Sequence, residues 1–413
     1  MNPKVKVAAK PTPVLRPMSS VQNKHRLTKT FLEEYAKLNP EQKRAVDTIE
    51  GPVMVVAGPG SGKTQVLALR TANILRKTQM RPGNILCLTF STSGAAAMRD
   101  RLRNLIGADA YGVTVDTIHG FCNTIIKAHP EVFEEWSALE QISDIERYRA
   151  IHRIIDELMP DCILAPRKNP YVRTKDIIGR ISMLKRESKV DENELRKIAD
   201  AYEQTQATKS KSGTKQHEKN LRAARKFREF LEVFSRYQAM LERTGRYDYE
   251  DMILHATKAL TEEPWLLSSL QERYQYILLD EVQDTNGAQW DFVRLLTEDP
   301  TGDEQPNIFI VGDDDQAIYR FQGANLRNIL AFHERFPSAE IITLKTSYRC
   351  SQPILDAAGK LIAKNTERLV GKVPGVEKKL TSKVSGVRFQ KPAVRGSEGL
   401  SGPERQSRNL KPH

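Results

Sequence analysis

The stretch VVAGPGSGKTQVLAL, residues 55–69, predicts an apolar strand, a glycine-rich turn and a helix, in that order. A loop of this kind holds phosphates, because its backbone N–H groups and the helix N-terminus face the anion. The segment AGPGSGKT (57–64) fits the phosphate-loop pattern except that Ala57 replaces the first glycine. A glycine-rich turn with a chance GKT is the alternative, but the preceding strand and the following helix argue against it.

Each part of this loop has an expected task. Gly60 and Gly62 permit close approach of the backbone, Lys63 would reach the β- and γ-phosphates, and Thr64 would ligate Mg²⁺. ATP and Mg²⁺ are therefore the expected ligands. The predicted nucleotide-binding residues of the loop are Ala57, Gly58, Pro59, Gly60, Ser61, Gly62, Lys63, Thr64 and Gln65.

The bulk composition points to a polyanionic partner. The 413 residues carry a formal net charge of +12, which favours nucleic acid first and an anionic membrane second. No stretch approaches the ~20 continuous apolar residues of a membrane span, so no membrane partner is expected. The four cysteines are far apart and form no CxxC pair, so neither a zinc nor an iron–sulfur site is predicted. Scattered cysteines suit a reducing cytosol, and we expect a cytoplasmic protein.

Apolar runs that alternate with helical patterns predict a parallel α/β sheet. Residues 131–243 are instead helical, polar and basic, which predicts an all-helical insertion. Within it, QATKSKSGTKQHEKN (206–220) predicts a flexible basic loop. The expected strands are PVMVVA (52–57), ILCLTF (85–90), YGVTVDT (111–117), YILLDE (276–281), NIFIVGD (307–313) and EIITL (340–344).

The stretch YILLDEVQDT (276–285) places two carboxylates at the end of an apolar strand. Asp280 would hold Mg²⁺ through water, and Glu281 would be the general base for an attacking water. The alternative is an acidic cluster that starts the next helix, with Asp284 and Thr285 as caps. The phosphate loop upstream favours the catalytic interpretation.

A third strand also ends in polar residues, in IFIVGDDDQAIYRFQGA (308–324). Gln316 is the candidate sensor of the γ-phosphate. Tyr319 and Phe321 could stack on unpaired bases, because stacking needs only the face of a base. The alternative is that both aromatic side chains belong to the core.

Eight motifs together give the chain a specific resemblance. It is similar to the N-terminal half of UvrD/Rep/PcrA-type superfamily 1 DNA helicases over about residues 31–383. The motifs occur in the family's order and spacing: LNPEQKRAV (38–46), AGPGSGKT (57–64), LTFSTSGAAAMRDRL (88–102), VTVDTIHGFC (113–122), YDYEDMI (247–253), LLDEVQDT (278–285), VGDDDQAIYRFQGA (311–324) and LKTSYRC (344–350).

The resemblance implies further roles, position by position. Gln42 would read the adenine edge, Tyr348 would stack on the adenine, and Arg349 would contact the γ-phosphate. Gln283 and Gln316 would couple that phosphate to DNA. The implied catalytic set is Lys63, Asp280, Glu281, Gln283, Gln316 and Arg349, and the implied DNA contacts are Phe90, Thr117, His119, Tyr319 and Phe321. The chain departs from the family at Gln65, where an arginine often helps to sandwich the base.

The resemblance also implies a domain plan: an α/β, P-loop RecA-like parallel-sheet domain with an inserted all-helical domain and a truncated start of a second RecA-like domain. The expected segments are a disordered basic arm (1–30), the RecA-like ATP-binding domain in two parts (31–130 and 244–344), the helical DNA-binding insertion (131–243), the start of the second domain (345–383) and a disordered tail (384–413).

The expected function is an ATP-dependent DNA helicase or translocase that moves 3′→5′ on single-stranded DNA. Single-stranded and tailed duplex DNA are the expected substrates, other DNA-repair proteins are candidate partners, and the expected location is the cytoplasmic nucleoid. The rival is a nucleotide-dependent DNA-binding module without motor activity, which the missing second domain favours. A P-loop kinase or GTPase explains neither DEVQD nor the aromatic run at 319–321.

Overall fold

The computed structural model of the chain describes residues 28–158, 162–298, 305–317, 326–365 and 368–384. Its centre is a six-stranded sheet with the spatial order β3-β2-β6-β7-β1-β8, in which every pair of neighbours is parallel. All six predicted strands are confirmed, with the bounds β1 Val53–Ala57, β2 Ile85–Thr89, β3 Thr114–Thr117, β6 Tyr276–Leu279, β7 Asn307–Gly312 and β8 Glu340–Leu344.

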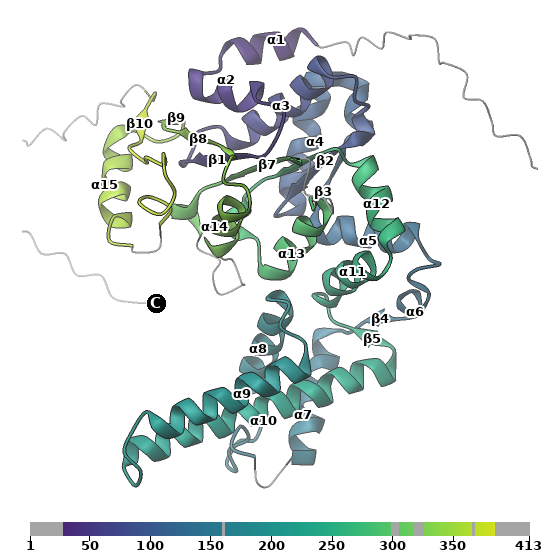
Figure 1. Cartoon of the computed structure of the whole chain (residues 1–413), viewed down its shortest axis with the longest axis vertical. Coiled ribbons are helices and arrows are strands. Elements are labelled where there is room, and N and C mark those ends of the chain that lie inside the picture. The colour runs from purple at the N-terminus through teal and green to yellow at the C-terminus, as the bar shows by residue number, and fades with distance from the viewer. Residues whose placement is uncertain (1–27, 159–161, 299–304, 318–325, 366–367, 385–413) are drawn as a thin grey trace, which may run out of the picture.

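Helices cover both faces of this sheet, so its central strands β1, β2, β6 and β7 are apolar and almost entirely buried, whereas the edge strands β3 and β8 are buried only in part. Successive residues of a strand point to opposite faces: Val53 and Val55 join one core, and Met54 and Val56 join the other. The first core is covered by α1 Lys29–Ala36, α2 Pro40–Asp47, α3 Lys63–Lys77 and α4 Thr92–Ile106. The second is covered by α5 Ile118–Ala128, α11 Asp251–Glu262, α12 Pro264–Arg273, α13 Gly287–Leu296 and α14 Leu326–Arg335 (Figure 1).

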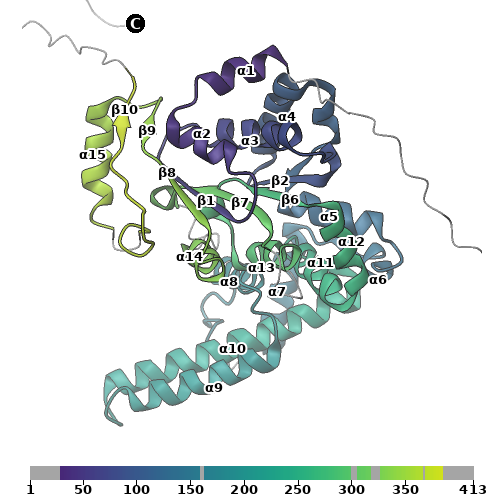
Figure 2. The ribbon, with the colours of Figure 1, turned by 45° about the horizontal axis from the view of Figure 1, so that its top comes forward.

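The helical insertion has a hydrophobic core of its own, made of residues from 142 to 241. The helices that form this core are α7 Asp144–Leu158, α8 Thr174–Arg186, α9 Glu192–Thr208 and α10 Lys215–Thr244. The short helix α6 Glu134–Ser137 instead contributes Trp136 to the second core of the sheet. The long α9–α10 hairpin projects away from the sheet (Figure 2). Two short strands, β4 Glu140–Gln141 and β5 Arg246–Tyr247, pair in parallel where the chain enters and leaves the insertion.

The predicted flexible loop at 206–220 is wrong for most of its length. Helix α9 continues to Thr208, and α10 begins at Lys215 with Thr214 as its N-cap, whose hydroxyl accepts from the backbone N–H of His217. Lysine, glutamine and glutamate are good helix formers. Because these residues are also polar, the sequence pattern did not indicate the ends of two helices, which a short turn connects.

The chain beyond β8 forms a small unit beside the sheet. It contains β9 Thr346–Ser347, α15 Gln352–Ile362 and β10 Thr381–Ser382, and β10 pairs in parallel with β9. The predicted α/β class with a helical insertion is confirmed. The division into domains, including a second domain that starts at 345, stays a prediction. Residues 1–27 of the predicted arm (1–30) lie outside the described residues. So do residues 385–413 of the predicted tail (384–413).

Throughout the ranges that the structure describes, none of the helices combines the length and the apolar character required to cross a bilayer.

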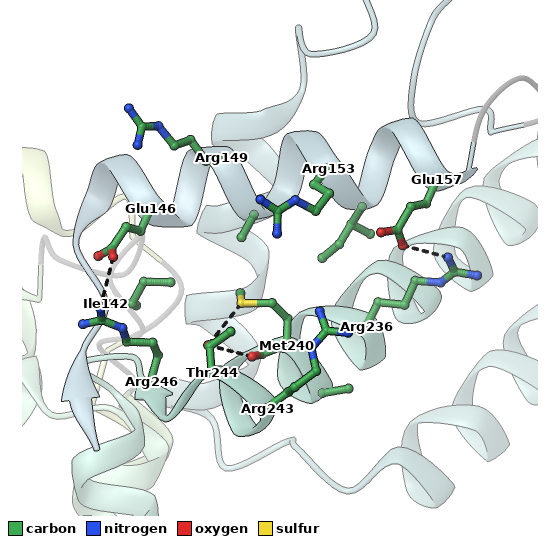
Figure 3. A pocket seen from close by; sticks show the side chains of 13 residues that line it. Ile142, Glu146, Arg149, Arg153, Glu157, Arg236, Met240, Arg243, Thr244 and Arg246 are labelled. Atoms are coloured by element: carbon green, nitrogen blue, oxygen red, sulfur yellow. Dashed lines mark hydrogen bonds and ion pairs between the residues drawn. The ribbon is translucent and has the colours of Figure 1, made fainter. Parts of the chain in front are cut away.

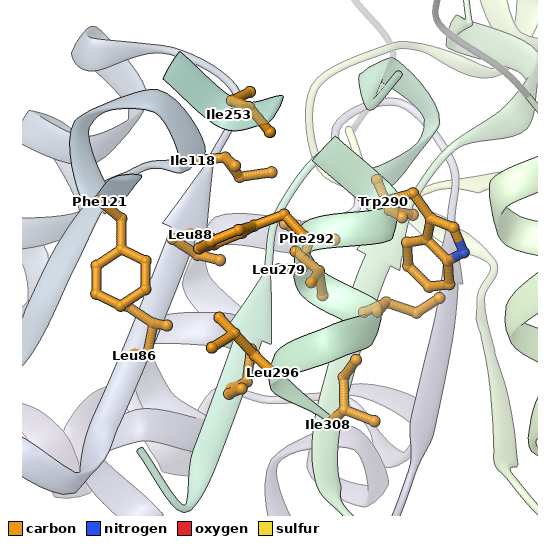
Figure 4. Packing of buried hydrophobic residues seen from close by; sticks show 14 of the residues in the cluster. Leu86, Leu88, Ile118, Phe121, Ile253, Leu279, Trp290, Phe292, Leu296 and Ile308 are labelled. Atoms are coloured by element: carbon orange, nitrogen blue, oxygen red, sulfur yellow. The ribbon is translucent and has the colours of Figure 1, made fainter. Parts of the chain in front are cut away.

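Phe292 on α13 tests how strongly the second core supports the sheet. Its side chain is fully buried, and its ring lies 6.1 Å from that of Phe121, at 71° (Figure 4). We expect Phe292→Ala to lower the free energy of unfolding by about 3–5 kcal/mol, because it leaves a cavity. Urea unfolding measures this. Leu361→Ala is the control, since Leu361 is 73% exposed and should cost less than about 0.5 kcal/mol. Similar losses in the two variants would contradict the assigned packing.

Candidate functional site

The phosphate loop joins the end of β1 to the start of α3. Gly60 and Gly62 have φ angles of +71° and +83°, which side-chain-bearing residues rarely adopt. The Ser61 hydroxyl donates to the carbonyl of Gly58 at 2.7 Å and holds the turn closed. Ala57 still belongs to β1 and is fully buried, so the loop's departure from the glycine pattern falls on extended backbone, where alanine is not strained. The loop therefore keeps an anion-binding geometry at the N-terminus of α3.

Lys63 faces the predicted catalytic carboxylates across the sheet. Its Nζ lies 2.7 Å from Oε2 of Glu281, and the Thr64 hydroxyl lies 3.5 Å from Oδ2 of Asp280. Glu281 has a φ of +52°, a left-handed conformation that costs energy in a residue with a side chain. Strand β6 thus ends in a strained turn that presents one carboxylate to Lys63 and the other to Thr64.

The two predicted glutamines meet at one aspartate. The Gln283 amide donates to Oε2 of Glu281 at 2.8 Å, and its oxygen accepts from the backbone N–H of Asp313 at 3.0 Å. Gln316 donates to the Asp313 carboxylate. A continuous chain of polar contacts therefore runs from Lys63 through Glu281, Gln283 and Asp313 to Gln316, across the ends of β6 and β7.

Burial perturbs two carboxyls of this site. Desolvation, followed by the negative charge of Glu281, raises the pKa of Asp280 to about 6, and the same two causes raise the pKa of Asp284 to about 6. Because the folded protein binds these protons more tightly than the unfolded chain does, the stability contribution is present at low pH. It is lost as the pH rises from about 4 to about 6. A buried Asp280 carboxylate above pH 6 is therefore a place where a bound cation would be favoured.

The predicted adenine residues gather beside the loop. Gln42 donates to the carbonyl of Ser61 at 2.9 Å, and the Tyr348 hydroxyl lies 3.5 Å from Oε1 of Gln42. The 347–349 segment rests on the loop itself: the Tyr348 N–H donates to the carbonyl of Gly60 at 2.9 Å, and a Cβ on Gly60 would lie 2.5 Å from Cβ of Arg349. Residues about 290 positions apart are thus brought together.

Gln65, the departure from the family pattern, lies between two charged side chains. Its amide donates to Glu34 at 3.1 Å, and its oxygen accepts from Arg101 at 3.0 Å. An arginine therefore lies next to this position, although it comes from α4 rather than from the residue after GKT.

The predicted DNA contacts are only partly described. Phe90 follows β2, and Thr117 is the last residue of the neighbouring strand β3. The Thr117 hydroxyl caps α5 by accepting from the Gly120 N–H at 3.0 Å. The His119 ring stacks on Tyr249 with centroids 4.1 Å apart. Burial, aided by the charge of Arg186, lowers the pKa of His119 to about 4, so the ring is neutral at pH 7. Tyr319 and Phe321 lie outside the described residues.

Sequence reasoning missed the cations that neutralise the GDDDQ motif. Lys378 is nearly buried, lies 2.7 Å from Oδ1 of Asp313 and also contacts Asp314. Arg368 binds both carboxylate oxygens of Asp315 at 2.7 Å. Three adjacent aspartates that are buried together require cations to compensate their charge. The cationic partners lie more than 50 residues away, so no local pattern identifies them.

Two comparisons with known proteins concern the sequence as a whole. Residues 38–337 match the family model of the UvrD/REP helicase N-terminal domain. The chain is 34% identical over 331 residues to the ATP-dependent DNA helicase PcrA of Staphylococcus epidermidis, and 33% identical to PcrA of Staphylococcus aureus. Each alignment covers 80% of this chain and 40% of the relative, so the chain spans about two fifths of the length of these proteins.

The raised pKa of Asp280 predicts a pH-dependent metal requirement. A proton on Asp280 competes with Mg²⁺, so Mg²⁺-dependent ADP binding should weaken about four-fold from pH 7.5 to pH 5.5, beyond the titration of ADP itself. Calorimetry on the wild type and on Asp280→Asn, which cannot titrate at this position, measures the difference. Asp284→Asn is the matched control and should keep the wild-type profile. Identical pH profiles for the wild type and Asp280→Asn would contradict the assignment.

Proposed function

Since the chain belongs to the UvrD/Rep helicase family, we propose that it hydrolyses ATP to move along single-stranded DNA in the 3′→5′ direction. The observation that carries this proposal is the polar chain from Lys63 to Gln316. It connects the phosphate loop to the segment that leads directly into Tyr319 and Phe321. A change at the γ-phosphate could therefore be transmitted to residues that stack on bases.

Thr64 and Asp280 fit a Mg²⁺ site. Mg²⁺ prefers few protein ligands and fills its remaining positions with water and phosphate oxygens, and these two side chains supply one hydroxyl and one carboxylate. When bound, the ion would neutralise negative charge on the phosphates. Gln42 and Tyr348 would hold the adenine. Arg349 would contact the γ-phosphate, and its position beside Gly60 supports this role.

The Lys63–Glu281 ion pair suggests an order of events for the proposed hydrolysis. Lys63 and Glu281 form an ion pair with 2.7 Å between Nζ and Oε2. When triphosphate binds, Lys63 would turn to the more highly charged phosphates, and Glu281 would lose its partner. The released carboxylate could then take a proton from the attacking water as general base, while Gln283 and Gln316 orient around the γ-phosphate.

DNA would cross the carboxyl ends of the strands, where Phe90, Thr117 and His119 lie. Stacking on aromatic side chains is tolerant of base identity, which suits movement over any sequence. Single-stranded and tailed duplex DNA are the proposed substrates. Residues 31–130 and 244–344 would form the ATP-binding domain, 131–243 would add salt-sensitive backbone contacts, and 345–383 would begin the second domain.

Glu281→Gln tests the proposal, because it keeps the size of the side chain and removes its basicity. We expect the rate of ATP hydrolysis in the presence of single-stranded DNA to fall at least about 100-fold. Nucleotide affinity in calorimetry should be retained.

Lys63→Ala is the companion variant and should weaken nucleotide binding itself, since it removes the cation from the phosphates. Turnover that is unchanged in Glu281→Gln would refute the assigned base. ATP and DNA binding by the wild type without DNA-stimulated hydrolysis would favour a nucleotide-dependent DNA-binding module instead.

A further inference from the structure

Lys378 is more deeply buried than Arg368, the other cation at the GDDDQ motif. Ion pairs on the surface, such as that of Arg236 with Glu157 at 3.4 Å on the insertion (Figure 3), contribute little to stability. The side chain of Lys378, by contrast, is only 3% exposed, and its Nζ lies 2.7 Å from Oδ1 of Asp313. An ammonium group that is so far removed from water needs anions close by to stay charged.

Three consecutive aspartates keep Lys378 protonated. Burial alone would lower the pKa of Lys378, but the charges of Asp313, Asp314 and Asp315 outweigh it and hold the pKa above its ordinary value. Lys378 also contacts Asp314, and its Nζ lies 3.3 Å from Oδ2 of Asp315. A displacement of this one ammonium group would therefore change the position of the turn that follows β7.

The carboxylate of Asp313 is shared between Lys378 and Gln316. Its Oδ1 accepts from Lys378, and its Oδ2 accepts from the side-chain amide of Gln316. The backbone N–H of Asp313 donates to Gln283, which also contacts Glu281. Because Asp313 is fully buried, these bonds are protected from solvent. The orientation of Gln316 therefore depends on where Lys378 holds this carboxylate.

The segment that carries Lys378 is connected to the phosphate loop. Lys378 lies shortly before β10, and β10 pairs in parallel with β9 (Figure 2). The hydroxyl of Ser347 in β9 donates to the carbonyl of Pro59 in the loop at 2.8 Å. The next two residues, Tyr348 and Arg349, are those that the proposed function places against the nucleotide. A nucleotide that displaced them would displace β9, β10 and Lys378 as well, because backbone hydrogen bonds join the two strands.

We propose that Lys378 is a positioning residue that couples nucleotide binding to the binding of single-stranded DNA, by moving Asp313 and with it Gln316. It provides a second route to Gln316 that starts at β9, whereas the first starts at Lys63. The two routes meet at Asp313. This inference rests on the proposed function.

The coupling is measured on the full chain as a ratio of affinities. Fluorescence anisotropy of a labelled oligo-dT gives the dissociation constant for the single strand, with and without Mg²⁺ and the non-hydrolysable analogue AMP-PNP. If the two sites are coupled, the analogue changes the affinity for DNA, and the strand changes the affinity for the analogue by the same factor. We expect the wild type to show a factor of about five or more.

Lys378→Met removes the charge and keeps most of the length of the side chain. We expect its coupling factor to fall below about two, while the affinities for DNA alone and for AMP-PNP alone stay at wild-type values. A folding defect would weaken these two affinities as well. Lys379→Met is the matched control, because Lys379 is the adjacent lysine and is exposed; it should keep the wild-type factor.

A second variant separates the lost contact from the lost balance of charge. Lys378→Met combined with Asp314→Asn removes one positive and one negative charge, so the buried cluster is not left with an additional uncompensated anion. The contact between Lys378 and Asp313 is still missing in this variant. We therefore expect its coupling factor to stay as low as in Lys378→Met.

A wild-type coupling factor in Lys378→Met would overturn this inference and leave the proposed function standing. Recovery of the factor in the charge-balanced variant would show that Lys378 only compensates charge, and would overturn the inference too. The same result would follow from an equal loss in Lys379→Met, since the effect would not be specific to the buried lysine. A wild type that binds DNA and AMP-PNP with no coupling between them would overturn the proposed function together with this inference.

Discussion

The parallel pairing of β6 with β7, and of β7 with β1, is the constraint on which the site depends. Parallel strands all end at the same edge, so the residues that follow three distant strands meet there. Lys63 follows β1, Glu281 follows β6 and Asp313 follows β7. Any change of register would separate Lys63 from Glu281, because each residue of slip moves a strand end by about 3.3 Å.

Buried ion pairs connect the segment after β8 and the helical insertion to the domain that contains the sheet. Lys378 binds Asp313 and Asp314 from the small unit after β8. Fully buried Lys185 of α8 lies 2.7 Å from Asp248 and 2.8 Å from Asp251, at the junction of the insertion with α11. Such pairs contribute modestly to net stability, yet removing one partner leaves a buried charge uncompensated, at a cost of about 3–5 kcal/mol. Separation of these segments would therefore raise the free energy of the folded protein.

Ion pairing and burial constrain the predicted catalytic carboxylates. Glu281 is paired with Lys63 and sits on strained backbone, while Asp280 is buried with a raised pKa. Phosphates and a divalent cation would relieve both conditions, one by drawing Lys63 away and the other by compensating Asp280. Part of the free energy of ligand binding would thus be used to rearrange the polar contacts that end at Gln316, which is the step that the proposed function requires between nucleotide and DNA.

The sequence by itself determined the strands, the phosphate loop, the acidic strand end and the family. These features are local: apolar runs define strands, glycines define the turn, and fixed short spacings define the motifs, as Gly60, Gly62 and Lys63 illustrate. It was wrong about 206–220, where polar helix ends resemble a loop. Only the tertiary structure decided that Gln283 and Gln316 share Asp313 and that Lys378 neutralises the aspartates. Those contacts depend on how separate segments pack: Gln283 lies 30 positions before Asp313, and Lys378 lies 65 positions after it. A linear pattern contains no term for the distance between such side chains.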